Sequence, residues 1–376
     1  MATKNLLIIA DSERDADMLY GTGLFVPDPF IFIRKAGQTH LVLSDLEIDR
    51  ASRLCPHATI HSLTTLRSAV QADGKATIGL ADIAAVLLRQ LRLKNITVPP
   101  TFPLSHARVL EAALPELRLS TACPFPERSI KSSDEIKKIQ AILKITEQGL
   151  QAGIELIRQA TPGRNGILRH RNRPLTSEAV RGAIHAEISS QGGIPCNTIV
   201  AGGEQACDPH ERGHGPLPAH APIILDVFPR SESTGYFGDI TRTVVRGTPS
   251  DALGKMYEAV GKAQRTGMTK IRAGAKALRV HQDVQQTFVE LGYVTRRHNN
   301  HMEGFFHGTG HGLGLEIHEG PGIGATTRDT LQSGQVVTVE PGLYYPGLGG
   351  IRLEDVIVVQ EGRPRKLTRL PHQFVI

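Results

Sequence analysis

A proline- and serine-rich stretch, residues 123–136, divides the chain and sets the first limit on its fold. The prolines that follow Cys123 stop the preceding structure, and Ser132 or Ser133 can cap a helix that starts after them. With 376 residues, the chain is also longer than one hydrophobic core usually supports. We therefore expect two domains, residues 1–125 and residues 126–376, each folded around its own core.

The first 125 residues alternate between short apolar runs and helical patterns. Strands are predicted at residues 5–10, 30–34, 40–43 and 95–98, with a helix at residues 81–93. This alternation predicts a small α/β domain.

The remainder of the chain is rich in β-branched runs bounded by glycine and proline. Strands are predicted at residues 197–200, 222–225, 241–245, 336–339 and 355–359. Helices are predicted from Asp134 to the Pro162-Gly163 stop, and at residues 176–191, 250–272 and 278–291. The second domain is therefore expected to be α+β, with helices flanking a mostly antiparallel sheet.

Composition excludes several classes of protein. A chain that is 40% hydrophobic and 21% charged is typical of soluble globular proteins, not of fibres or disordered chains. Four cysteines without a CxxC pair favour a reducing compartment. The apolar run Leu6–Ala10 is too short for a signal peptide or a membrane span. We expect a cytoplasmic protein that does not enter a membrane.

The net charge of +6 raises the question of an anionic partner. Arginines crowd one polar stretch, at Arg164, Arg169, Arg171 and Arg173. No nucleic-acid-binding motif accompanies them, so the stretch is interpreted as a solvated loop. We expect no binding to nucleic acid.

Residues 306–319 carry four glycines and three histidines that point to a ligand-binding segment. His307 and His311 are four residues apart, as in a helical HExxH zinc site. That interpretation fails, because the glutamate is absent and each glycine would destabilise a helix by about 1 kcal/mol. Glycines at this density instead let the backbone turn tightly and approach a ligand.

Acidic residues lie at the ends or on the faces of predicted strands. Asp226 closes one strand, Asp239 precedes the next, and Glu340 ends a third before Pro341-Gly342. Arg352 and Glu354, two residues apart, are expected to face the same side of a strand. Individually, each has an ordinary interpretation as a turn residue or a surface ion pair.

Together, these four carboxylates and His311 would make an implausible core unless a positive charge cancels theirs. Two divalent cations would do so. Oxygen-rich ligands with one imidazole suit manganese, cobalt, iron or zinc, and the hardness of the set favours manganese.

The chain resembles the pita-bread metallopeptidases, which include Xaa-Pro aminopeptidase, prolidase, methionine aminopeptidase and the metal-free creatinase. The segments that carry the resemblance are Leu225-Asp226, Gly238–Thr243, His307–Gly314 with His318, Val339–Gly342, and Gly350–Asp355. The resemblance covers nearly the whole chain and implies a pita-bread catalytic domain preceded by a creatinase-like N-terminal domain. Methionine aminopeptidases lack such a leading domain, and creatinase lacks the metal ligands.

The resemblance also implies residue roles. It places Asp226 on one metal ion, Asp239 and Glu354 between both ions, and His311 and Glu340 on the second. It makes Glu340 the general base that activates a water molecule. Contacts to the substrate or to the developing oxyanion fall to His318, His307 and His210, with His214 as a rival to His210. Arg352 would orient a ligand carboxylate.

The implied reaction is hydrolysis of the peptide bond that precedes a proline at the second position of a peptide substrate, by a homodimer. Dipeptidase and aminopeptidase activities stay equally open, as does another small C–N or C–S substrate or a catalytically silent binding module. One departure bears on the substrate: the family usually has glycine two residues after its first ligand, where this chain has Phe228. The stretch to Asp239 also looks slightly longer than usual.

Overall fold

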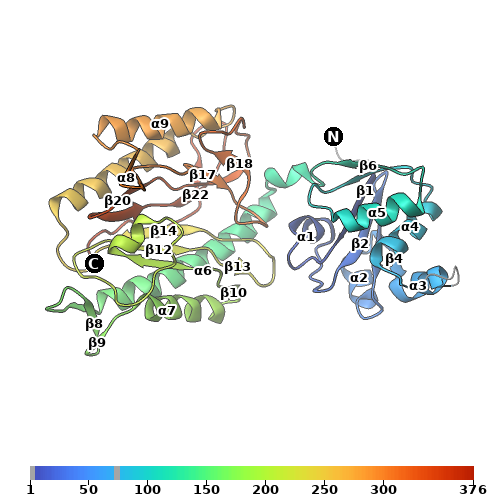
Figure 1. Cartoon of the computed structure of the whole chain (residues 1–376), viewed down its shortest axis with the longest axis horizontal. Coiled ribbons are helices and arrows are strands. Elements are labelled where there is room, and N and C mark those ends of the chain that lie inside the picture. Colours follow the sequence, from blue (N-terminus) through green and yellow to red (C-terminus); the bar gives the residue numbers. More distant parts are fainter. Residues whose placement is uncertain (1–4, 72–76) are drawn as a thin grey trace. The chain divides into compact units, whose positions relative to one another are not determined.

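The computed structural model describes residues 5–71 and 77–376. The chain divides into two compact units, Met1–Arg128 and Ser129–Ile376 (Figure 1). The expected boundary between residues 125 and 126 lies just before this division.

The first unit is built on one mixed six-stranded sheet in the order β4-β3-β2-β1-β5-β6. Its elements are β1 (Asn5–Ala10), α1 (Ala16–Thr22), β2 (Phe30–Lys35), β3 (Gln38–Leu43), α2 (Ile48–Leu54), β4 (Ala58–Ser62), α3 (Leu63–Gln71), α4 (Leu80–Gln90), β5 (Asn95–Val98), α5 (Leu104–Ala113) and β6 (Arg118–Thr121). Alternate side chains of β1 enter different cores, since Leu7 and Ile9 pack with α4 while Leu6 and Ile8 pack with α1. Apolar residues thus cover both faces of this sheet.

The helices of the second unit form two packed pairs, α6 (Ser133–Arg158) with α7 (Ser177–Ser190) and α8 (Asp251–Lys270) with α9 (Ala277–Glu290). The pairs lie on opposite sides of the strands (Figure 1). Side chains cap the starts of α6, α7 and α8. At α6, the Ser132 hydroxyl accepts from the backbone N–H of Glu135, whose carboxylate accepts from the Ser132 N–H. Among the described residues, no helix is both long and apolar enough to cross a membrane.

The strands of the second unit pair antiparallel in several small sheets. The two that matter most for the site have the orders β11-β12-β14 and β18-β17-β19-β22-β23. Their members are β11 (Ile199–Gly202), β12 (Ile223–Val227), β14 (Ile240–Val244), β17 (Gly310–Gly312), β18 (Glu319–Ile323), β19 (Val336–Val339), β22 (Asp355–Val358) and β23 (Arg365–Lys366). A hairpin of β20 (Gly342–Tyr345) and β21 (Gly349–Arg352) joins β19 to β22.

The other elements are short. They are η1 (Pro126–Ser129), β7 (Thr161–Pro162), β8 (Leu168–His170), β9 (Arg173–Pro174), β10 (Gly193–Ile194), η2 (Gly203–Cys207), β13 (Arg230–Ser231), β15 (Arg296–His298) and β16 (His301–Glu303). The interpretation of the arginine-rich stretch as a loop is correct for Arg164 and Arg171, which lie in turns, and wrong for Arg169 and Arg173, which lie in β8 and β9. All four arginines are nevertheless exposed.

Two further strand predictions need correction. The strand expected at residues 197–200 begins at Ile199, because Asn197 has a left-handed backbone with φ of 43°. Arg352 and Glu354 do not share a strand face, because β21 ends at Arg352 and β22 begins at Asp355. Glu354 lies in the break between two differently paired strands.

Candidate metal centre

The five expected metal ligands come from five segments of the second unit. Asp226 lies in β12, Asp239 directly before β14, His311 in the middle of β17, Glu340 directly after β19, and Glu354 between β21 and β22. His311 therefore lies on a strand and not on the helix that a helical zinc motif would need. The rejection of that motif is confirmed, although the glycines were expected to form turns.

Two glycines allow the close packing that positions these side chains. A Cβ atom on Gly310 would lie 2.0 Å from the carbonyl oxygen of Thr338, so β17 can approach β19 only with glycine there. A Cβ atom on Gly238 would lie 2.2 Å from the hydroxyl of Thr146 on α6. The residues that follow these glycines, His311 and Asp239, are thus brought to the same place.

Asp239, His311 and Glu354 each offer a ligand atom, and these atoms lie within 4.8 Å of one another. His311 Nε2 lies 3.6 Å from Asp239 Oδ2 and 3.3 Å from Glu340 Oε1. Thr338 supports this arrangement, because its hydroxyl accepts from the His311 backbone N–H and donates to Glu340. Four of the expected ligands therefore converge.

The electrostatics of the cluster favour a bound cation. Burial, followed by the charges of neighbouring carboxylates, raises the pKa of Asp239 and of Glu354 well above their usual values. Burial likewise raises the pKa of Glu340 to about 7. Burial lowers the pKa of His311, which keeps the imidazole neutral as a metal ligand requires.

Glu354 has a buried carboxylate oxygen that no hydrogen bond from the described residues satisfies. Glu354 Oε2 accepts from the hydroxyl of Thr241 at 2.9 Å, but Glu354 Oε1 has no hydrogen-bond partner among the described residues. An unsatisfied carboxylate oxygen is costly in a protein interior. A divalent cation would satisfy it, so the residues present fit the metal that the sequence predicts.

Asp226 differs from the other carboxylates because it has a cationic partner. Its Oδ2 accepts from Arg352 Nη2 at 2.8 Å, and both residues are buried. Arg352 also donates from Nη1 to the Tyr344 hydroxyl at 2.9 Å. Arg352 thus holds an expected ligand carboxylate in the manner that the resemblance implies for it.

Tyr344 is a residue that the sequence reasoning missed. Its fully buried hydroxyl lies 2.8 Å from His307 Nε2 and links that ring to Arg352. Gly342, opposite Arg352 in the β20–β21 hairpin, precedes Tyr344 by two residues and so shares a strand face with it. The hairpin pairing was the signal that could have identified Tyr344.

The histidines occupy different environments. His307 Nδ1 donates to the carbonyl oxygen of Gly308 while Nε2 faces Tyr344, so protein groups engage both ring nitrogens. Burial, helped by the charge of Arg352, lowers the pKa of His307 to about 3. His307 is therefore neutral and internally bonded, which favours a structural role over the substrate contact expected for it.

His318 and His210 are less constrained. The ring centroid of His318 lies 4.3 Å from that of His311, and no hydrogen bond to its ring is present among the described residues. His210 is exposed, and its neighbour Pro209 accepts from Arg352 through its carbonyl oxygen. Its rival His214 interacts instead with Gln205 and Glu211, so this geometry favours His210.

A buried acidic cluster around a neutral histidine, framed by two helix pairs, is compatible with a bound divalent metal ion. Over residues 137–361 the chain matches metallopeptidase family M24, and it belongs to that family. The family uses divalent metal and acts on peptides, and the cluster of Asp239, His311 and Glu354 is compatible with such an ion.

Several known proteins resemble the chain. An uncharacterised peptidase of Bacillus subtilis, YqhT, is 34% identical over 254 residues, which cover 66% of this chain and 65% of the relative. An Xaa-Pro dipeptidase of Pyrococcus furiosus is 30% identical over 256 residues, with the same two coverages. The chain thus covers slightly less than two thirds of the length of these relatives.

The crystal structure of an X-Pro aminopeptidase from Thermotoga maritima has the same fold. The TM-score is 0.82 at 24% sequence identity, and the alignment covers 100% of this chain and 98% of that one. This likeness confirms the pita-bread α+β fold and the leading α/β part expected from the sequence.

Proposed function

We propose that this chain hydrolyses Xaa-Pro peptide bonds with two divalent metal ions. The proposed ligands are Asp226, Asp239, His311, Glu340 and Glu354. The observation that carries the proposal is the convergence of buried carboxylates on His311, with Glu354 Oε1 left unsatisfied. Membership of a metallopeptidase family supports it.

Asp239 and Glu354 are the proposed bridging ligands. Each is buried, and after burial the charges of neighbouring carboxylates raise the pKa of each. Arg352 occupies Oδ2 of Asp226, which leaves Oδ1 for a metal ion. The excess of carboxylate oxygens favours manganese over softer ions.

Bound divalent ions polarise a peptide carbonyl and make water nucleophilic near neutral pH. Glu340 is the proposed general base, because its carboxylate lies beside His311 and its pKa without metal is already near neutrality. It would take a proton from the attacking water and return it to the proline nitrogen as the C–N bond breaks. His318 has free ring nitrogens with which to contact the developing oxyanion.

Selectivity for proline is proposed from two sources. The Pyrococcus furiosus relative is an Xaa-Pro dipeptidase, and the Thermotoga maritima structure is of an X-Pro aminopeptidase. In addition, proline has no amide hydrogen, so a pocket without a hydrogen-bond acceptor can bind it at the second position of the substrate. Any other residue at that position would bury an unpaired N–H.

Metal analysis and a peptide series test the proposal. We expect about two ions per chain, and a kcat/KM for Ala-Pro peptides at least about tenfold above that for Ala-Ala peptides. Both series should be measured with manganese and with cobalt, because Phe228 can reshape the pocket. Equal rates for the two series would leave a metallohydrolase of other specificity, and a chain without metal would be a silent binding module.

The same series distinguishes the two kinds of peptidase. Cleavage of Ala-Pro alone would identify a dipeptidase, whereas cleavage of Ala-Pro at the start of longer peptides would identify an aminopeptidase.

A further inference from the structure

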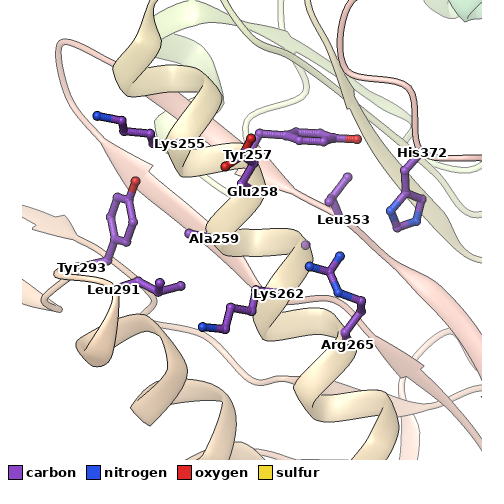
Figure 2. A pocket seen from close by; sticks show the side chains of 11 residues that line it. Lys255, Tyr257, Glu258, Ala259, Lys262, Arg265, Leu291, Tyr293, Leu353 and His372 are labelled. Carbon is purple, nitrogen blue, oxygen red and sulfur yellow. The ribbon is translucent and has the colours of Figure 1, made fainter.

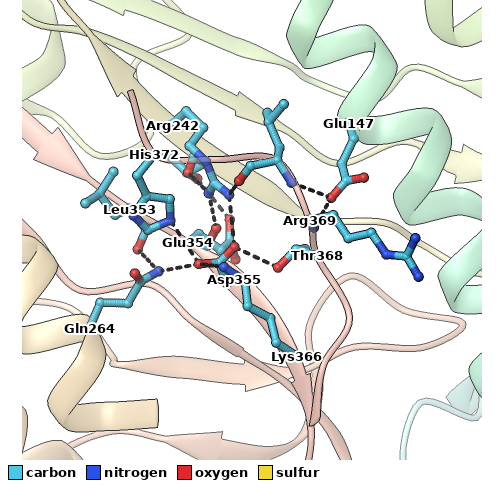
Figure 3. Close-up of polar contacts among 12 residues, drawn as sticks. Glu147, Arg242, Gln264, Leu353, Glu354, Asp355, Lys366, Thr368, Arg369 and His372 are labelled. Carbon is cyan, nitrogen blue, oxygen red and sulfur yellow. Dashed lines mark hydrogen bonds and ion pairs between the residues drawn. The ribbon is translucent and has the colours of Figure 1, made fainter. Parts of the chain in front are cut away.

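Asp355, the residue after Glu354, is the centre of a buried polar network behind the cluster (Figure 3). Its carboxylate is fully buried and accepts hydrogen bonds or ion pairs from five side chains. Oδ1 accepts from Arg242 at 2.9 Å and Thr368 at 2.7 Å, and Oδ2 accepts from Gln264 at 3.2 Å, Lys366 at 2.9 Å and His372 at 3.0 Å.

Gln264, on α8, connects this network to two ligand-bearing segments. Its Nε2 lies 3.2 Å from the carbonyl oxygen of Val339 and 3.1 Å from that of Leu353. These carbonyls belong to the residues that directly precede Glu340 and Glu354. One buried amide therefore sets the spacing between the backbones that carry two proposed ligands.

Arg242, on β14, makes a similar connection. Its guanidinium donates to the backbone carbonyls of Thr241 and Glu354 as well as to Asp355. Thr241 in turn donates its hydroxyl to the Glu354 carboxylate. The segment after Asp239 and the backbone of Glu354 are thus joined by one buried cation whose counter-charge is Asp355.

The last part of the chain closes the network. Lys366, Thr368 and His372 reach Asp355, while the carbonyl oxygen of Leu370 accepts from Arg242. Glu147 on α6 fixes this segment by accepting from the backbone N–H groups of Arg369 and Leu370 (Figure 3). Residues 366–372 contribute side chains to the polar network, although no sequence motif places them near the cluster.

We propose that Asp355 and the segment of residues 366–372 form a positioning element that sets the separation of Asp239, Glu340 and Glu354 and thereby the affinity for metal. The inference rests on the proposed metal centre. Asp355 is bonded to Arg242 and Gln264, which hold the backbone carbonyls of Glu354, Val339 and Leu353. The element therefore acts through the backbones that carry the ligands.

His372 offers a test of the positioning role, because a small molecule in solution can replace its side chain. It lines a cavity of about 620 Å³ beside α8, together with Tyr257, Lys262 and Leu353 (Figure 2). Replacing His372 by alanine would leave a space next to Asp355 that is accessible from this cavity. Imidazole from solution can then occupy that space and donate to the carboxylate.

The experiment titrates metal-free protein with Co²⁺ and follows its visible absorption, which reports ligand geometry without any substrate. In Asp355→Asn, the dissociation constant should rise about tenfold or more, the usual size of effects on groups that support metal ligands. His372→Ala and Lys366→Met should weaken binding less, with altered spectra. Imidazole should restore His372→Ala to the wild type titrated at the same imidazole concentration, a reference that is needed because imidazole itself binds Co²⁺. Lys262→Met, a lysine in the same cavity without a bond to the network, should match the wild type.

The outcomes separate this inference from the proposed function. A wild-type chain that binds no Co²⁺ would remove both. Normal Co²⁺ affinity and spectra in folded His372→Ala and Lys366→Met would overturn the positioning role alone, as would an equal loss in Lys262→Met. If Asp355→Asn fails to fold, His372→Ala, Lys366→Met and the rescue by imidazole still test the positioning role.

Discussion

Glu354 and Asp355 are neighbours in the chain and almost equally buried, with 1% and 0% of their surfaces exposed, but their environments are opposite. Glu354 faces other carboxylates, and its Oε1 has no hydrogen-bond partner in the part of the chain that the structure describes. Asp355 is surrounded by donors, and its pKa is lowered by His372, Arg242 and Lys366 despite its burial.

The difference shows how a buried carboxylate indicates function. Asp355 is neutralised by cationic side chains of the protein itself, so it can hold its neighbours in place without a metal ion of its own. Glu354, Asp239 and Glu340 form no ion pair with a lysine or arginine in the described part of the chain, so they require a charge from outside it. Burial alone would not have separated the two; the inventory of partners does.

The largest effect is expected from Glu354→Gln. Losing one bridging carboxylate should remove metal and reduce peptide hydrolysis by about 10³-fold or more. Because the substitution also removes a charge repelled by its neighbours, the metal-free variant should be at least as thermally stable as the metal-free wild type. Metal content, hydrolysis rate and melting temperature check this. A marked loss of metal-free stability would show that Glu354 is neutralised within the protein after all.

The corresponding change of acid to amide at the next residue, Asp355→Asn, should mainly lower the stability of the protein. Asp355→Asn leaves the guanidinium of Arg242 buried without its counter-charge, which should cost about 3–5 kcal/mol of unfolding free energy. Urea unfolding of metal-free protein measures it, with Glu354→Gln as the matched control. Equal stability of the two variants would contradict the contrast between the neighbours.

The pH dependence of stability should separate the same two environments. The folded protein holds a proton on Glu340 up to about pH 7, whereas an ordinary glutamate releases it near 4.5. This contribution to metal-free stability is therefore full below about pH 4.5 and is lost as the pH rises to about 7, by about 3 kcal/mol. Asp355 has the opposite sign, because its pKa is lowered and its contribution is lost only in acid.

Urea unfolding of the metal-free protein between pH 5 and 8 checks this, with Glu340→Gln as the reference that cannot titrate. The difference between the two proteins should grow in favour of the variant as the pH rises. A difference that does not change with pH would show that Glu340 has an ordinary pKa.

Much of the fold was predictable because its signals are local. Ser132, Thr176 and Ser250 each cap the helix that follows them, and the apolar periods of those helices are read directly from the sequence. Most predicted strands were likewise correct within a few residues. The strand predicted from Asn197 begins two residues later, at Ile199, because Asn197 has a left-handed backbone that the β-branched residues after it do not reveal.

The site was less predictable where it depends on distant pairing. Arg352 and Glu354 were placed on one strand because spacing alone does not show where pairing passes from β20–β21 to β19–β22. Tyr344 was missed for the same reason. The bonds from Lys366, Thr368 and His372 to Asp355 depend on where the last part of the chain folds back, which no local pattern specifies.

The smallest effect concerns two histidines that repeat the contrast between Glu354 and Asp355. His318 lies against His311 without a hydrogen bond to its ring from the described residues, whereas protein groups engage both nitrogens of His307. His318→Ala should therefore keep its metal and its stability but lose about 100-fold in kcat, the scale of one oxyanion contact. His307→Ala should instead lose about 1–3 kcal/mol of stability, because the buried Tyr344 O–H loses its acceptor while Arg352 still donates to its oxygen. Metal content, urea unfolding and kcat for both variants measure this, with His214→Ala as a control expected to be unchanged.

If His307→Ala is as stable as the wild type but loses kcat, then His307 does contact the substrate, as the sequence suggested, and its bond to Tyr344 breaks when substrate binds.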